Sequence, residues 1–174
     1  RSVERAVALD PALAAAHRFR AQVLADLHRW AEPLAAYTRA AVLAPHDPQP
    51  SYRIGRLIER HSDRPGDAAV YYRDALARDA TYHPAVKALV ALLTDRGRCE
   101  EAEAVAERGA FATWQPQQRA AVRAQVGRCF LDRGDPPAAR GHLSAAVVLD
   151  PDATGAWWLL AQTDFALARD AEAA

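Results

Sequence analysis

Few residues of this 174-residue chain combine the types and the spacing that chemistry requires. His61, Ser62 and Asp63 are the residue types of a catalytic triad, but triad members meet in space, and three consecutive residues form a polar turn instead. The six histidines are scattered, and no pair has the spacing of zinc ligands. Phosphate-binding glycine loops and metalloprotease motifs do not occur in the sequence. The sequence therefore predicts no catalytic residue, no metal and no cofactor, and hence a protein that is not an enzyme.

The cysteines and the densest acidic cluster also have simple structural explanations. Cys99 and Cys129 are not part of a CxxC pair, and two cysteines do not make a disulfide framework, so we expect two reduced, packed thiols. Glu100, Glu101 and Glu103 form the acidic start of a helix, where negative charge favours the helix dipole.

Composition narrows the classes of protein and of partner. Hydrophobic residues make up 51% of the chain and charged residues 25%, and alanine, the best helix former, dominates the apolar set, which predicts an all-α fold. A formal net charge of zero argues against nucleic acid and anionic membranes as partners. The chain has no methionine and its sequence opens within a helix, so we expect a fragment of a longer protein. Abundant arginine beside a single lysine indicates a bacterial origin, with the cytoplasm as the default location.

A short segment recurs along the chain. AVALDP at residues 6–11 returns as AAVLAP at 40–45 and as AVVLDP at 146–151, and weaker copies lie at 75–80 and 109–114. The steps between copies are 34, 35, 34 and 37 residues. A fixed period of this length is typical of stacked helical repeats.

The repeat resembles the tetratricopeptide repeat, a helix–turn–helix unit of 34 residues. The residues that carry the resemblance are small or apolar at fixed positions of each unit. In the third unit these are Ile54, Gly55, Ala68, Tyr72 and Ala75; in the fifth they are Val126, Gly127, Phe130, Ala139, Leu143, Ala146 and Pro151. Trp157 takes the place of the family tryptophan in the last unit, where we expect it in the core.

The resemblance implies a single α-solenoid over residues 1–174, built of antiparallel helix pairs stacked into a right-handed superhelix. The second helix of a first unit fills residues 1–13, full units follow at 14–47, 48–82, 83–116 and 120–153, and a truncated unit occupies 154–174. Gln117, Gln118 and Arg119 are inserted at a unit boundary, where we expect a longer helix or an irregular turn next to Trp114.

In this family the first helix of each unit lines a concave groove, so the resemblance also implies candidate ligand-binding residues. The candidates combine a repeated cation with two aromatic side chains; they are Arg18, Tyr52, Arg53, Arg56, Lys87, Arg128 and Trp158. Acids follow at the groove edge, at Asp26, Asp95 and Asp132. One interpretation is a cationic stripe for an extended acidic peptide, and the other is a solvated face with ion pairs inside each helix.

Three functions remain open at this point. The first is a non-catalytic scaffold that binds a protein or peptide in the groove. The second is an accessory or substrate-recognition region of a larger enzyme, such as a glycosyl- or sulfotransferase, because similar arrays precede such domains. The third is an RNA-binding repeat, for which stacking aromatics are scarce. The family's clamp for chaperone tails needs asparagines, and this sequence has none.

Overall fold

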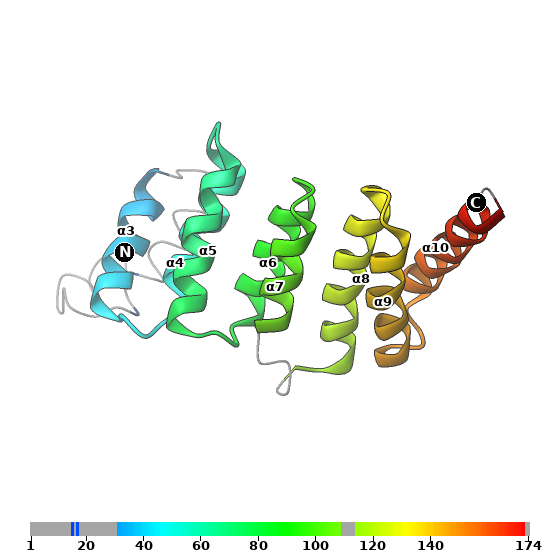
Figure 1. Ribbon diagram of the computed structural model, residues 1–174. Coiled ribbons are helices and arrows are strands. Elements are labelled where there is room, and N and C mark those ends of the chain that lie inside the picture. The colour runs from blue at the N-terminus through cyan, green and yellow to red at the C-terminus, as the bar shows by residue number, and fades with distance from the viewer. Residues whose placement is uncertain (1–14, 16, 18–30, 109–113, 173–174) are drawn as a thin grey trace. The chain divides into compact units, whose positions relative to one another are not determined.

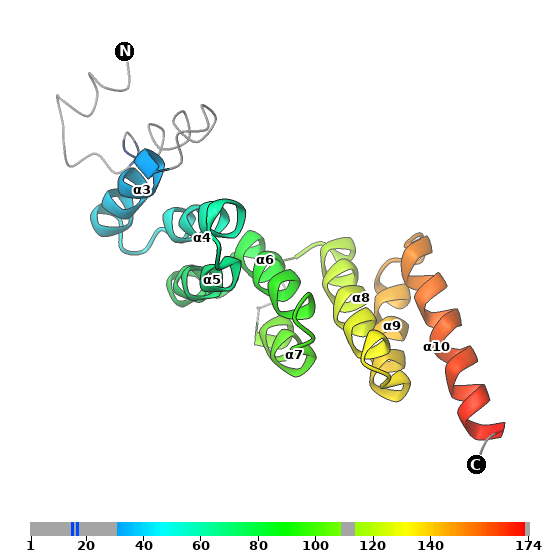
Figure 2. The same cartoon turned by 90° about the horizontal axis from the view of Figure 1, so that it is seen from above.

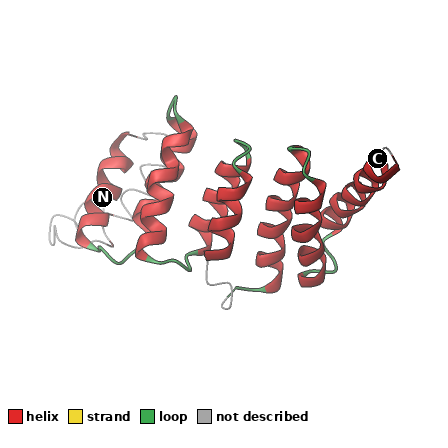
Figure 3. Cartoon of the chain, in the orientation of Figure 1, coloured by secondary structure: helices red, strands yellow, loops and turns green. Residues whose placement is uncertain are grey.

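The computed structural model describes residues 15, 17, 31–108 and 114–172, and it shows helices joined by short turns, with no strand among these residues (Figures 1 and 3). The all-α fold class expected from the sequence is therefore confirmed. Contacts divide the chain into two compact units, Arg1–Ala85 and Val86–Ala174, and each is described by itself. None of the helices described is long and apolar enough to cross a membrane.

The first unit contains α3 (Ala31–Leu43), α4 (Gln49–His61), the short 3₁₀ helix η1 (Pro65–Asp67) and α5 (Ala68–Arg78). The helix α4 packs against both α3 and α5. Prolines stand in the first turns of α3 and α4, where no helical hydrogen bond is lost. The centre of the core is made of side chains with almost no exposed surface: Tyr37, Ala40, Ile54, Tyr72 and Ala75.

The second unit contains most of α6 (His83–Thr94), followed by α7 (Cys99–Arg108), α8 (Pro116–Asp132), α9 (Pro136–Leu149) and α10 (Thr154–Glu172). The helix α9 contacts α8 on one side and α10 on the other (Figure 2). Most of the larger buried side chains come from α6, α8 and α9; among them are Val86, Leu89, Val90, Leu93, Val126 and Leu143.

Two glycines allow the helices of a pair to touch. A Cβ atom added at Gly55 of α4 would lie 2.5 Å from the Tyr72 ring on α5, and one added at Gly127 of α8 would lie 2.7 Å from Leu143 on α9. Real Cβ atoms do not approach other atoms so closely, so both positions need glycine. These are the small-residue positions of the repeat pattern, and the expected contact between paired helices is confirmed.

The turns that reverse the chain in the second unit contain glycines in the left-handed conformation and an aspartate that caps the next helix. Gly97 and Gly134 end α6 and α8 with φ values of 66° and 79°, in the left-handed region that glycine enters without strain. Asp135 then caps α9, because its side chain accepts a hydrogen bond of 3.1 Å from the Ala138 backbone N–H.

The inserted residues before the fifth unit lengthen a helix. The helix α8 has 17 residues, against 12 in α6, and Gln117, Gln118 and Arg119 lie in its first turns. Trp114 stands just before this helix and is 7% exposed. The expectation of a longer first helix beside a buried Trp114 is confirmed.

The tryptophan of the last unit does not lie in the core. Trp157 is 50% exposed, and its indole N–H donates a hydrogen bond of 2.9 Å to the Pro151 carbonyl. The interpretation of Trp157 as a core residue is therefore wrong within the residues described.

One arginine connects α3, α4 and α5. Arg78, near the end of α5, donates hydrogen bonds of 3.1 Å and 2.9 Å to the carbonyls of Ala41 and Pro45, at and beyond the end of α3. Its Nε also donates to Asp74 at 2.9 Å, and Asp74 accepts a hydrogen bond from Ser51 of α4. A cation near the last carbonyls of a helix also favours the helix dipole.

The glycine contacts predict that alanine substitutions change stability in opposite directions at different glycines. Gly55→Ala and Gly127→Ala should each lower the free energy of unfolding by about 1–3 kcal/mol, because the added methyl group overpacks a filled interface. Gly141→Ala is the matched control: it lies in α9 with no atom within 4 Å of its Cβ position, and should raise stability by roughly 0.4–1 kcal/mol. Denaturant unfolding measures all three changes, and equal effects at the three positions would contradict the packing argument.

Replacing Arg78 by alanine should lower stability, because the arginine connects α5 to α3 and, through Asp74, to α4. Arg78→Ala should cost about 1–3 kcal/mol in unfolding free energy, because it leaves the Ala41 and Pro45 carbonyls without this donor and Asp74 without its ion-pair partner. Arg140 of α9 is the control, since its pair with Asp164 is exposed and such pairs contribute roughly 0–1 kcal/mol. A loss at Arg78→Ala no larger than that at Arg140→Ala would show that these hydrogen bonds are dispensable.

Candidate functional site

Three of the expected ligand-binding residues lie on α4 in the first unit. Tyr52, Arg53 and Arg56 are all half-buried. The Tyr52 ring lies 5.9 Å from that of Tyr72 and 5.7 Å from that of Tyr82, and the Arg53 guanidinium lies 6.0 Å from the Tyr52 ring centre. Tyr52 is thus held in an aromatic cluster, with a cation beside its face.

Arg56 belongs to a short polar chain that reaches into the core. Its Nε lies 3.5 Å from the Glu59 carboxylate, and the same carboxylate accepts a 2.6 Å hydrogen bond from the hydroxyl of the buried Tyr72. Burial of the ring, together with this hydrogen bond, raises the pKa of Tyr72 above its ordinary value of 10.0. The positive charge of Arg56 therefore balances the negative charge of the Glu59 carboxylate. This carboxylate helps to hold the Tyr72 ring against Gly55.

A cavity of about 450 Å³ lies near some of the expected residues of the second unit. It lies between the end of α6 and the second half of α8. The lining residues are predominantly polar: Thr94, Asp95, Gly97, Gln125, Arg128, Cys129, Asp132 and Arg133. Arg128 is the one expected cation among them, and Asp95 and Asp132 are the acids predicted at the groove edge. This volume is typical of a site that takes a small group or part of a peptide.

The charged side chains at this cavity differ in how strongly they are held by ion pairs. Arg133 forms two 2.7 Å hydrogen bonds with the Glu100 carboxylate, which lowers the pKa of Glu100 and leaves this arginine little capacity for a ligand. Arg128 lies 3.5 Å from Asp132, and both side chains are 67% exposed. An exposed pair of this kind contributes little, so a ligand can replace it at small cost. Asp95 has no ion-pair partner among the residues that the structure describes.

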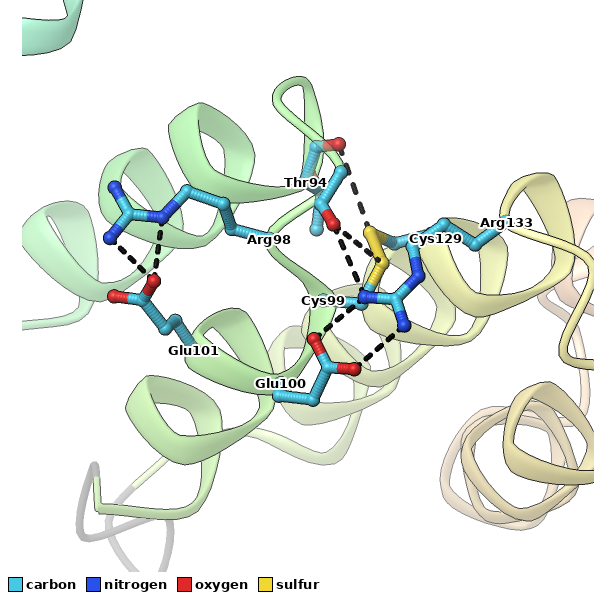
Figure 4. A network of polar contacts seen from close by, with 8 residues as sticks. Thr94, Arg98, Cys99, Glu100, Glu101, Cys129 and Arg133 are labelled. Atoms are coloured by element: carbon cyan, nitrogen blue, oxygen red, sulfur yellow. Dashed lines mark hydrogen bonds and ion pairs between the residues drawn. A yellow bond between two sulfur atoms is a disulfide. The ribbon is translucent and has the colours of Figure 1, made fainter.

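The cavity wall also contains a covalent bond that the sequence interpretation missed. Cys99, the first residue of α7, and Cys129 of α8 form a disulfide with a Cα–Cα distance of 5.7 Å (Figure 4). The expectation of two reduced thiols is therefore wrong. The two cysteines are 30 residues apart in sequence, and only the packing of α7 against α8 brings their Cα atoms within disulfide range.

The remaining expected residues lie apart from this cavity. Lys87 of α6 and Trp158 of α10 are exposed, Trp158 by 63%, and neither lines the cavity. Arg18 is outside the described residues. Arg53 and Lys87 form no ion pair within the described part of the chain. The groups on α4 and on α8 belong to different units, so the shared face expected for all seven residues stays a prediction.

Comparison with known proteins supports the repeat interpretation. No family model matches the chain. A similar structure is YrrB, a TPR protein with an unusual peptide-binding site, at a TM-score of 0.71 and 18% identity over 94% of this chain and 82% of that one. A TPR repeat-containing protein from Cytophaga hutchinsonii reaches a TM-score of 0.76 at 13% identity, over 97% of this chain and 65% of that one. This chain has the tetratricopeptide-repeat fold.

A sequence relative adds a second comparison. Cellulose synthase operon protein C from Xanthomonas axonopodis pv. citri (strain 306) is 36% identical over 118 residues, which cover 65% of this chain. The chain spans only 8% of the length of that relative. The match therefore concerns one stretch of a much longer protein.

Within the tetratricopeptide fold, α4, α6, α8 and α10 are first helices, and the cavity lies where two of them follow one another. The family pattern located Asp95, Arg128 and Asp132 at the groove, and all three line the cavity. It missed Thr94, the last residue of α6, Gly97 in the turn that follows, Cys129 within α8 and Arg133 just after α8. Among the described residues no three histidine, cysteine or acidic side chains are grouped as metal ligands would be.

The raised pKa of Tyr72 predicts a loss of stability in alkali. The unfolded chain ionises this tyrosine near pH 10, whereas the folded chain keeps it protonated, so stability present below pH 10 is lost as the pH rises further. Between pH 10 and 11 the wild type should lose about 1 kcal/mol more than Tyr72→Phe, which cannot ionise. Denaturant unfolding at several pH values measures this difference, and parallel profiles for the two proteins would refute it.

Proposed function

We propose that this chain is a non-catalytic scaffold that binds an extended, acidic segment of another protein, with the cavity between α6 and α8 as its main contact. The observation that carries the proposal is the state of Arg128: a cation at the cavity, held only by a loose, exposed pair with Asp132. Its planar guanidinium can donate two parallel hydrogen bonds to a carboxylate of the ligand. The peptide-binding site of the structurally similar YrrB supports a peptide as the ligand class.

The acids at the cavity suggest how a peptide would be oriented. Asp95 and Asp132 can accept hydrogen bonds from backbone N–H groups of an extended chain, while Gln125 can both donate and accept. A carboxylate side chain would then meet Arg128. On α4, Tyr52 and Arg53 offer an aromatic face and a cation for a second contact, and on α10 Trp158 offers a rigid apolar surface.

A second candidate function is that of an accessory region within a larger enzyme, such as a glycosyltransferase. The observation that favours it is the 36% identity with cellulose synthase operon protein C. Deleting the coding sequence of this chain in the cell should then lower the amount of polysaccharide made. Unchanged polysaccharide would count against this candidate and leave the scaffold function standing.

The disulfide indicates the type of cellular compartment in which the protein is located. Bonded cysteine pairs persist in oxidising compartments and are rare in the cytosol. The default expectation of a cytoplasmic location rests on no particular residue, so Cys99 and Cys129 favour a compartment outside the cytoplasm.

Peptides of matched length and opposite charge test the binding proposal. A labelled ten-residue peptide with alternating glutamate and alanine should bind more tightly than its lysine counterpart in fluorescence anisotropy. Arg128→Ala should weaken the glutamate peptide by about 1 kcal/mol, roughly fivefold in dissociation constant, and high salt should shrink the difference.

Arg140→Ala is the control, because it removes an exposed arginine of α9 whose partner is Asp164 and which does not line the cavity. It should leave peptide binding unchanged. Circular dichroism should show that each variant stays folded, since exposed substitutions usually shift stability by less than about 0.5 kcal/mol. Equal binding of the two peptides, or equal losses for Arg128→Ala and Arg140→Ala, would end the proposal of an acidic ligand at this cavity.

A further inference from the structure

We infer that the Cys99–Cys129 disulfide is a lock on the α6–α8 cavity, and that thiol exchange at this bond loosens the cavity wall. The inference rests on the proposed function, because it concerns the regulation of the same site. It starts from the position of the bond, which joins the beginning of α7 to a lining residue of α8.

The joint between α7 and α8 is poor in apolar contacts. The buried residues of α7 are Cys99, Ala102 and Ala106, all with small side chains. Small side chains remove little apolar surface from water, and hydrophobic stabilisation scales with that surface. The disulfide is therefore the strongest attachment that α7 makes to its neighbour.

The remaining ties across the joint are polar. The Arg133 guanidinium binds the Glu100 carboxylate, with the two side chains 42% and 62% exposed. Arg133 also donates a 3.4 Å hydrogen bond to the Gly97 carbonyl, and Gln125 Nε2 donates a 3.3 Å hydrogen bond to Thr94 Oγ1 at the end of α6. His142 Nε2 of α9 lies 3.0 Å from Glu103 Oε1 of α7. Exposed pairs contribute little in water. Without the covalent bond, polar contacts of Arg133 and Gln125 would remain to hold the turn after α6 against α8.

The two sulfur atoms differ in their surroundings. Cys129 lines the cavity and is 5% exposed, whereas Cys99 is fully buried. An attacking thiolate would therefore approach the Cys129 sulfur through the cavity. Cys99 would leave as a thiolate at the first residue of α7, where the free backbone N–H groups of the helix favour negative charge.

The reaction balances with a dithiol as reductant. One thiolate of the dithiol attacks Cys129 Sγ, the bond between the two cysteines breaks, and a mixed disulfide forms at Cys129. The second thiol of the reductant then displaces Cys129 and closes the reductant's own disulfide. Two electrons pass from the reductant to the pair, and the two protons released by the dithiol end on Cys99 and Cys129.

A ligand in the cavity and the disulfide must influence each other. If the bonded form binds a peptide more tightly than the reduced form, then the peptide stabilises the bond by the same factor. A peptide that covers Cys129 should also slow its reduction, because it blocks the approach to the sulfur.

Hydrogen exchange of the whole chain tests the lock without any ligand. The oxidised protein is compared with the protein reduced by a dithiol, and with the double variant Cys99→Ala, Cys129→Ala, which has no thiol. Amides of residues 94–98 and 125–133 should exchange at least tenfold faster in both altered forms. Central amides of α9 (Pro136–Leu149) should change by less than threefold.

The control for the substitutions is Arg140→Ala, which removes the exposed pair between α9 and α10 and should leave exchange at residues 94–98 unchanged. Unchanged exchange at the joint after reduction would refute the lock. An equal acceleration in α9 would also refute it, because the bond would then stabilise the unit as a whole.

The glutamate–alanine peptide separates the two proposals. If the lock and the proposed function both hold, the reduced protein should bind this peptide at least threefold more weakly, and a saturating amount of peptide should slow reduction by the dithiol. If the peptide binds neither form, the proposed function fails while hydrogen exchange still decides the lock. Equal affinity in both forms would show that the bond does not regulate the site.

Discussion

The close approach of paired helices is the constraint on which the rest of this structure depends. Gly55 lets the Tyr72 ring lie against the backbone of α4, and Gly127 does the same for Leu143 against α8. Arg56 and Arg128 directly follow these glycines in the chain, which places each of them about 100° around its helix from the contact with the paired helix. The positions of the arginines that are available for binding therefore depend on the two glycines that allow the paired helices to approach.

Sequence reasoning succeeded where a single residue decides a local conformation. Gly97 and Gly134 have the positive φ values expected after a helix, and Asp135 caps α9 as its place before Pro136 and Pro137 predicts. The repeat period located the small residues that pair the helices, because the period reflects the spacing of contacts along the chain. These features depend on neighbours within a few residues or on a fixed repeat.

The features that the sequence did not reveal depend on tertiary contacts. The Cys99–Cys129 bond forms because the short, alanine-rich helix α7 packs against α8. The spacing of the two cysteines in the sequence does not predict it. Trp157 matches a core position of the repeat, yet it is half exposed beside α9. The cavity could be predicted only in part, since Arg128, Asp95 and Asp132 follow the repeat pattern, whereas Gly97 enters through the turn after α6 and Cys129 is placed there by the disulfide.

The hydrogen bonds of Arg78 have a consequence for how such repeats can be exchanged. Their acceptors, the carbonyls of Ala41 and Pro45, lie in the preceding repeat, 37 and 33 residues earlier in the chain. Carbonyl acceptors are present whatever side chains surround them, so the earlier repeat can vary freely in sequence as long as its backbone ends in the same place. A graft that moved this arginine with its own repeat would need only a neighbour of the correct length. A deletion of one residue before Pro45 would leave every side chain of the later repeat intact and still break the connection between the two.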